Sequence, residues 1–222
     1  EQNIYAGLGN KVTSFLPGVI FTSYPETKNI KKKKTIYVGP VINKDIVKIN
    51  KTNNIEILTI GVQGGSQGSK QINNYLYKFL NENKTIKVNF LHITGKDKLE
   101  NNFDFKNYSQ FDFIDNMSEY YRKINLQISR SGGGALEAAY LGIPQVLIPF
   151  KHGTTSSHQY LNAQYLDNLG AAIVVNSYIE FKNILLNIIN DYEVKKREMF
   201  NNVNIPIGNT EISRYLKEAL DE

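Results

Sequence analysis

The sequence has 222 residues, of which 41% are hydrophobic and 21% charged, as is typical of a globular chain with one large domain or one and a fraction. No apolar stretch approaches the roughly 18 residues of a membrane-spanning helix. Cysteine is absent, which excludes disulfides, thiolate metal sites and cysteine nucleophiles. The histidines, His92, His152 and His158, are too scattered for an obvious zinc site, so we expect no metal and no cofactor.

The net charge of +5 does not indicate a nucleic-acid-binding protein, because the lysines form only one run, Lys31–Lys34, with little aromatic interleaving. This run is either a solvated loop or a contact for an anionic membrane surface or for phosphates.

Apolar periodicity and turn residues predict strands that alternate with helices. We predict strands over Val19–Thr22, Ile55–Val62, Ile86–Ile93, Phe111–Ile114, Leu126–Ser129, Gln145–Pro149 and Ala171–Val175. Helices are predicted over Leu8–Phe15, Lys70–Leu80, Met117–Arg122, Ala135–Leu141, Gln159–Leu169, Ile179–Tyr192 and Thr210–Leu220. The predicted fold is therefore α/β, a Rossmann-like parallel sheet with helices on both faces. Residues 36–204 form this domain, 1–35 are the tail of a preceding domain plus a linker, and 205–222 form a C-terminal helix.

Two glycine-rich turns, Gly64–Gly68 and Gly132–Gly134, each join a predicted strand to a helix. Such turns let the backbone approach an anion closely, and the helix dipole favours a diphosphate there. Neither turn has the spacing of an ATPase P-loop or of a dinucleotide-binding fingerprint. A single turn of this kind is often only a tight connection, but two in one sheet favour phosphate binding.

Glu137 follows the second turn and is predicted to lie in the first turn of its helix. It either complements the helix dipole or accepts hydrogen bonds from a ribose diol. Gln159 and Asn162 open the next helix, where amides suit sugar hydroxyls and also suit an ordinary helix start. His152 and His158 lie near this region and are candidate bases or solvated loop residues. Asp112 and Asp115 are interpreted as turn formers.

These motifs together resemble the MurG family of glycosyltransferases. The similar segments run in order along most of the chain: Glu1-Gln2-Asn3, Gly7–Lys11, Gly64–Gly68 with Ile72-Asn73, Phe113–Met117, Ser129–Gly132, Glu137 with Gly142-Ile143-Pro144, and His158-Gln159 with Asn162-Ala163. Members of the family transfer N-acetylglucosamine (GlcNAc) from UDP-GlcNAc to lipid I, which yields lipid II for peptidoglycan synthesis. The resemblance implies a GT-B fold, of which this chain is the donor-binding, C-terminal half.

The resemblance also implies a set of donor contacts and partners. Ser66 would bind the diphosphate, Ile114 the uracil, Glu137 the ribose and Gln159 the GlcNAc hydroxyls. The implied UDP-GlcNAc-binding residues are Asn3, Ser66, Ile114, Gly133, Gly134, Ala135, Leu136, Glu137 and Gln159. The catalytic base would lie in an N-terminal acceptor domain that this chain lacks, so the chain alone is expected to be inactive. The other implied partners are a lipid-linked acceptor and an anionic membrane surface, at the cytoplasmic side of the bacterial cell membrane.

Two departures from the family pattern affect the site. An arginine that helps to neutralise the donor phosphates in the family is missing near Ile42, and Lys44 is a candidate replacement. The segment between Gly132 and Glu137 is one residue short, which blurs the assignments of Gly133, Gly134 and Ala135. Two alternatives stay open: a diacylglycerol glycosyltransferase of the same architecture, and a non-catalytic nucleotide-sugar-binding subunit of a split transferase.

Overall fold

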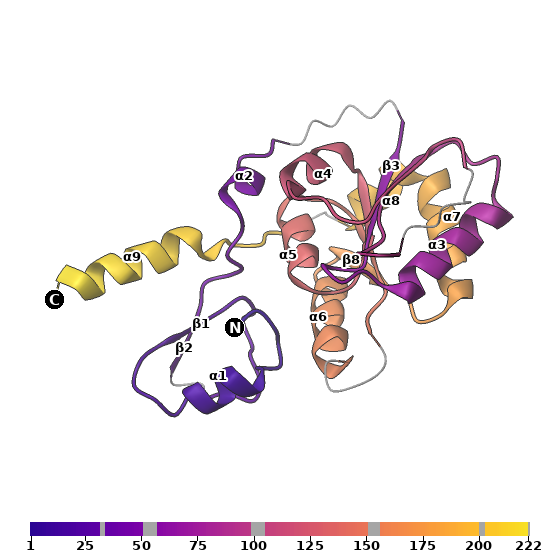
Figure 1. Cartoon of the computed structure of the whole chain (residues 1–222). Helices are drawn as coiled ribbons and strands as arrows, with labels where there is room; N and C mark the ends of the chain where they lie inside the picture. Colours follow the sequence, from indigo (N-terminus) through magenta and orange to yellow (C-terminus); the bar gives the residue numbers. More distant parts are fainter. Residues whose placement is uncertain (32–33, 51–56, 99–104, 151–155, 200–202, 222) are drawn as a thin grey trace.

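The computed structural model describes residues 1–31, 34–50, 57–98, 105–150, 156–199 and 203–221 (Figure 1). Its main feature is a sheet of six parallel strands in the order β5-β4-β3-β6-β7-β8. In chain order the strands are β3 (Thr59–Gln63), β4 (Asn89–Ile93), β5 (Tyr108–Phe111), β6 (Leu126–Ser129), β7 (Gln145–Leu147) and β8 (Ala172–Val174). From the centre of the sheet, β3, β4 and β5 follow one another toward one edge, and β6, β7 and β8 follow one another toward the other edge. The topological switch point therefore lies between β3 and β6.

Helices cover both faces of this sheet (Figure 1). On one face lie α3 (Lys70–Glu82) and α7 (Tyr178–Asn190), with α8 (Tyr192–Met199) packed against α7. On the other face lie α4 (Met117–Lys123), α5 (Gly133–Tyr140) and α6 (Ser156–Asn168). The predicted α/β, Rossmann-like arrangement is therefore confirmed.

Helix α3 illustrates how the sequence specifies these elements. The Ser69 hydroxyl accepts a hydrogen bond from the Ile72 amide at 3.3 Å and so caps the first turn. The apolar residues of α3 recur at helical spacing and are all buried against the sheet, namely Ile72, Leu76, Phe79 and Leu80. The predicted helix is thus present, and it extends to Glu82.

The N-terminal residues form a smaller unit beside the sheet. It contains α1 (Leu8–Thr13) and a two-stranded parallel sheet of β1 (Ile20–Thr22) and β2 (Thr35–Tyr37). The short α2 (Lys44–Val47) leads from this unit to the main domain, where Ile42 and Ile46 join the core beside α4. The division of the chain at residues 35 and 204 stays a prediction.

The C-terminal helix α9 (Gly208–Asp221) extends away from the main sheet (Figure 1). At its start the Asn209 side chain exchanges two hydrogen bonds with the Ile42 backbone, at 2.9 and 2.7 Å. Further along, the Tyr215 ring meets the Phe21 ring edge-on at 5.3 Å between centroids. Helix α9 therefore contacts the N-terminal unit and the segment that leads from it to the main domain.

Several boundaries differ from those predicted. Strand β5 is Tyr108–Phe111 and not Phe111–Ile114, because β5 lies at the sheet edge and pairs only with β4, so it needs no apolar pattern. The prediction missed β2, α2 and α8, which are short or polar. The first part of the strand predicted over Ile55–Val62 lies outside the described residues.

A histidine is buried in the core of the main domain. His92 on β4 has no exposed surface, and its ring nitrogens lie 2.8 Å from the Tyr108 hydroxyl and 3.1 Å from the Asn73 Oδ1. The Asn73 amide in turn donates to the Thr94 carbonyl at 3.0 Å. Burial lowers the pKa of His92 to about 3, because the charged imidazolium would lose its hydration. His92 is therefore a neutral, structural residue.

Candidate donor-binding site

A cavity of about 520 Å³ opens at the carboxyl end of the strands, above the switch point between β3 and β6. This is the place where open α/β sheets bind ligands. The lining residues come from the turn after β3, the first turn of α3, the ends of β6 and β7, and α6: Gly64, Gly68, Ser69, Lys70, Gln71, Arg130, Phe150 and Gln159. Of the nine predicted site residues, only Gln159 lines this cavity.

Arg130 provides a fixed positive charge in the cavity. It follows β6 directly, is half-buried, and its guanidinium donates to the Ser69 hydroxyl at 2.7 Å, to Gln71 Oε1 at 3.0 Å and to the Ile148 carbonyl at 2.6 Å. Its guanidinium carbon lies 5.3 Å from the centre of the Phe150 ring. Since Lys70 and the N-terminus of α3 lie beside it, the cavity suits an anionic ligand such as a diphosphate.

The turn after β3 depends on glycine at position 68. Gly68 has φ +64°, and a Cβ there would lie 2.1 Å from the Thr94 carbonyl oxygen. This close approach places the turn against the loop that follows β4. Ser66 is exposed in the same turn but is not one of the residues that line the cavity. Its role as a diphosphate ligand stays a prediction.

Replacing Gly68 with alanine is expected to destabilise the fold by about 3 kcal/mol, because the left-handed backbone costs a non-glycine residue 1–2 kcal/mol and the Cβ clash adds to it. Gly65→Ala is the matched control: Gly65 has φ +82°, but a Cβ there meets nothing within 4 Å. Its cost should be roughly 1 kcal/mol. Urea denaturation of both variants measures the difference, and equal losses would contradict the close approach.

The turn after β6 and the start of α5 differ from the prediction. Helix α5 begins at Gly133, two residues before the predicted Ala135, so Glu137 lies in its second turn and not in its first. Gly133 is exposed and Gly134 half-buried, whereas the side chains of Ala135 and Leu136 are buried in the core. A ligand beside this segment would therefore meet the backbone of Ala135 and Leu136, and not their side chains.

The Glu137 carboxylate is half-buried and has a partner within the protein. Its Oε2 accepts a hydrogen bond of 2.8 Å from the hydroxyl of the buried Tyr121 on α4. Loss of hydration raises the pKa of Glu137, and the bond from Tyr121 partly opposes that rise. The interpretation of Glu137 as an exposed residue that complements the helix dipole is therefore wrong. A ribose-binding role stays a prediction.

Asn162 is a structural residue and not a sugar ligand. It is fully buried on α6, and its Oδ1 accepts a hydrogen bond from the Ile4 amide at 3.0 Å. Its Nδ2 donates to the Ser131 carbonyl at 3.1 Å and to the Asn3 Oδ1 at 3.0 Å. Asn162 thus joins three segments, and it brings Asn3 beside the turn after β6.

Gln159 lies between the turns after β6 and β7. Its Oε1 accepts a hydrogen bond from the Phe150 amide at 3.1 Å, and its backbone carbonyl accepts one from the Ser131 hydroxyl at 2.5 Å. The bond from Phe150 fixes the Gln159 side chain at the wall of the cavity, and the bond from Ser131 fixes its backbone. Its amide nitrogen is the group suited to donate to a sugar hydroxyl.

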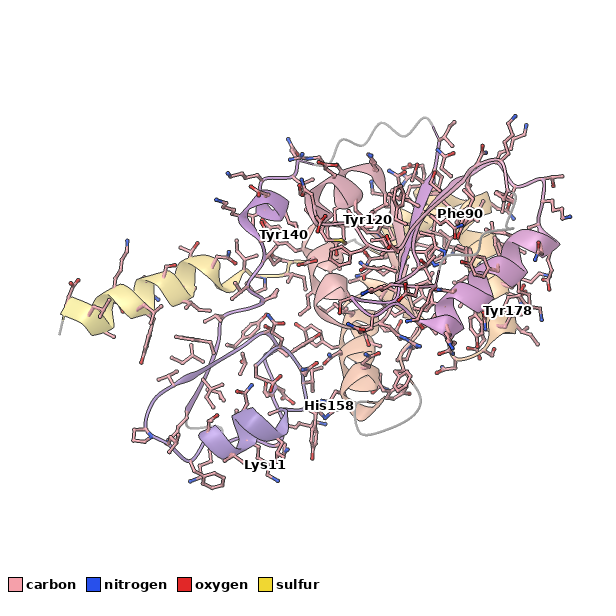
Figure 2. The ribbon with its side chains drawn as sticks, in the orientation of Figure 1. Lys11, Phe90, Tyr120, Tyr140, His158 and Tyr178 are labelled. Carbon is pink, nitrogen blue, oxygen red and sulfur yellow. The ribbon has the colours of Figure 1, made fainter. Side chains whose placement is uncertain are left out.

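The remaining candidates lie away from the cavity lining. Ile114 is half-buried in the loop after β5 and packs on the core beside α4, so any contact with uracil would be through its backbone. The ring of His158, a residue labelled in Figure 2, lies 5.1 Å from the Tyr5 ring of the N-terminal unit between centroids, with the two planes tilted by 38°. His152 lies outside the described residues. Asp112 accepts a bond from the Phe113 amide at 2.8 Å, in line with a turn former.

The segment in which the family's arginine is missing, around Ile42 and Lys44, lies away from the cavity. Ile42 is a core residue, and Lys44 is exposed at the start of α2; neither lines the cavity. The cationic residues in the lining are Lys70 and Arg130. Sequence reasoning assigned Arg130 no role, although a cation at the end of a central strand, before a glycine-rich turn, was a usable signal.

Residues 59–208 match the C-terminal domain of glycosyltransferase family 28. The chain belongs to this family. A Bacillus cereus relative, named UDP-N-acetylglucosamine–N-acetylmuramyl-(pentapeptide) pyrophosphoryl-undecaprenol N-acetylglucosamine transferase 3, is 30% identical over 216 residues, which cover 92% of this chain and 60% of the relative. A Lawsonia intracellularis transferase named for the same reaction is 34% identical over 188 residues, 79% of this chain and 52% of the relative.

Solved structures confirm the fold. The MurG of Acinetobacter baumannii superposes with a TM-score of 0.75 at 21% identity, over 97% of this chain and 65% of MurG. The UDP-GlcNAc 2-epimerase of Neisseria meningitidis gives a TM-score of 0.62 at 16% identity, over 96% of this chain and 63% of the epimerase. The predicted resemblance is thus confirmed at the level of the family and of the GT-B fold. The chain spans about 60% of the length of the first curated relatives that it matches.

Proposed function

We propose that this chain is the UDP-GlcNAc-binding part of an N-acetylglucosaminyltransferase that converts lipid I to lipid II in peptidoglycan synthesis. The observation that carries the proposal is the cationic cavity at the switch point, where Arg130 lies beside the capped start of α3. Family membership and the names of the relatives support the choice of sugar and acceptor.

In the proposed reaction the acceptor hydroxyl attacks the anomeric carbon of GlcNAc, and the bond to the UDP oxygen breaks with inversion. The leaving diphosphate takes up negative charge, which Arg130 and the α3 dipole stabilise. Glu137 holds the ribose and Gln159 the sugar, while Asn3, Ser66 and Ile114 contribute as predicted from the family. The acceptor proton passes to a base in the part of the longer protein that this chain does not span.

The test is the preference among nucleotides. We expect the chain to bind UDP more tightly than ADP or NAD, because the family resemblance supports a uracil contact at Ile114 and the cavity suits a diphosphate. Isothermal titration with the three ligands measures this preference. A preference for ADP or NAD, or no binding of UDP at millimolar concentration, would overturn the proposal.

The proposed partner of the N-terminal unit is the acceptor domain of the longer protein. Helix α1 buries none of its residues, and the side chains of Leu8, Val12, Phe15 and Leu16 are all exposed. Leu8 and Val12 lie four positions apart on α1, and Phe15 and Leu16 follow its end, so this part of the unit leaves apolar side chains available to pack against another domain. The lipid-linked acceptor would bind between the two domains.

We also propose that the complete protein acts at the cytoplasmic face of the bacterial membrane. Lys31 lies 4.6 Å above the Phe15 ring, and Lys34 donates to the Leu16 carbonyl at 2.5 Å, so cations lie beside the exposed apolar residues that follow α1. Lysines beside apolar side chains favour an anionic lipid surface. Among the described residues, no helix has the length and apolar character needed to cross a membrane.

A further inference from the structure

A buried tyrosine connects α4 and α5, the helices that precede and follow β6 in the chain. The Tyr121 side chain on α4 is completely buried, and its hydroxyl lies 2.8 Å from Glu137 Oε2 and 3.1 Å from the Gly134 carbonyl oxygen. A hydroxyl has one proton, so the two acceptors share it. Tyr121 therefore contacts both the carboxylate assigned to the ribose and the first turn of the helix that presents it.

Three glutamines of the sheet support the first turn of α5. Gln63, Gln127 and Gln145 lie on the neighbouring strands β3, β6 and β7. Gln127 pairs with Gln145 on β7 and with Gly61 on β3, and Gln63 is two residues beyond Gly61, so all three side chains point to the same face of the sheet, the face that α5 covers. Gln63 Nε2 donates to Gln127 Oε1 at 3.0 Å. Gln127 Nε2 reaches the Gly134 carbonyl at 3.2 Å, and Gln145 Nε2 donates to the Ala135 carbonyl at 3.0 Å. The start of α5 is thus hydrogen-bonded to β6 and β7, and Gln63 on β3 supports it through Gln127.

The side chains of Gln63 and Tyr121 approach the backbone of Gly134 so closely that a larger residue would fit there only by displacing them. A Cβ at Gly134 would lie 3.1 Å from Gln63 Nε2 and 3.2 Å from the Tyr121 hydroxyl. Glycine at this position therefore lets the polar side chains reach the helix backbone. Gln63, Gln127 and Gln145 are at most 9% exposed, whereas Glu137 is half-buried. Its second oxygen, Oε1, has no hydrogen bond from any residue that the structure describes, so it can accept one from a ligand.

We propose that Tyr121 is a positioning residue for the nucleoside end of the donor: its hydroxyl holds the Glu137 carboxylate and the start of α5 in the orientation that receives the ribose diol. This inference rests on the proposed function, since it takes UDP as the ligand. Tyr121 itself does not touch the ribose and acts through Glu137.

The chain offers a matched control in the adjacent residue. Tyr120, which is labelled in Figure 2, is also buried. Its hydroxyl has no hydrogen-bond partner among the described residues. Tyr121→Phe and Tyr120→Phe therefore remove the same atom from neighbouring buried sites, and only the first removes a bond to Glu137. A general effect of deleting a buried hydroxyl would be the same in both variants.

The experiment titrates UDP and 2′-deoxy-UDP into wild type, Tyr121→Phe, Tyr120→Phe, Glu137→Gln and the Tyr121→Phe/Glu137→Gln double variant. Tyr121→Phe should weaken UDP binding roughly tenfold and weaken 2′-deoxy-UDP binding less, so that discrimination between the two ligands falls. The double variant should bind UDP about as weakly as Glu137→Gln alone, because both changes remove one interaction. Tyr120→Phe should leave both affinities unchanged.

Equal losses for UDP and 2′-deoxy-UDP, or equal effects of the two Phe substitutions, would overturn the proposal. Gly134→Ala is a second perturbation, which displaces the Tyr121 hydroxyl without removing it and should lower the same discrimination. ¹³C NMR of the Glu137 carboxyl separates this inference from the proposed function, because it needs no ligand. Its pKa should rise in Tyr121→Phe and not in Tyr120→Phe; an unchanged pKa in both would overturn the positioning role even if UDP binds.

Discussion

Replacing Arg130 with glutamine is expected to lower the affinity of this chain for UDP by roughly fiftyfold. A charge-assisted hydrogen bond to a phosphate contributes about 1.5–3 kcal/mol, and glutamine keeps the polarity of the site without the charge. Arg130 is well placed for this role because Ser69, Gln71 and the Ile148 carbonyl already orient its guanidinium. The measurement is isothermal titration with UDP.

Uridine supplies the control for this prediction. It lacks the diphosphate, so its affinity should change less than threefold in Arg130→Gln. Arg130→Lys retains a positive charge without the forked geometry, and its loss of UDP affinity should be intermediate. If uridine and UDP lose affinity equally in Arg130→Gln, the arginine does not act on the phosphates.

Replacing His92 with glutamine is expected to remove a large part of the acid sensitivity of the fold. The pKa of His92 is about 3 in the folded protein, against 6.5 for an unperturbed histidine. Between these values the unfolded chain binds a proton that the folded chain does not, so stability falls as the pH drops below 6.5. From pH 7 to pH 3 wild type should lose roughly 3–5 kcal/mol more than His92→Gln.

Urea denaturation from pH 7 to pH 3 measures this difference. Tyr108→Phe is the control, because it removes the hydroxyl bonded to the His92 ring and leaves the imidazole in place. Its stability should lie below that of wild type throughout the acid range. Parallel pH profiles for wild type and His92→Gln would show that His92 does not contribute to acid unfolding.

Local patterns were sufficient to predict the order of the main elements. The strand Leu126–Ser129 is present with the predicted bounds, and the apolar spacing of Lys70–Leu80 gave a helix because one face of it had to be buried. Strand β5 was misplaced because an edge strand, half exposed, carries little apolar signal. The start of α5 was predicted two residues late because glycine is a poor helix former, although Gly133 and Gly134 open the helix.

The sequence by itself determined the fold class, the family and the edge of the sheet at which a ligand would bind, because these depend on periodicity, turn residues and ordered motifs. Only the tertiary structure decided which side chains meet there. Arg130 and Ser69 are 61 residues apart, and Asn162 and Ile4 are 158 apart, so no local pattern pairs them. Tyr121 and Glu137 lie on different helices, and it is the packing of α4 and α5 around β6 that turns an apparently exposed carboxylate into a half-buried, hydrogen-bonded one.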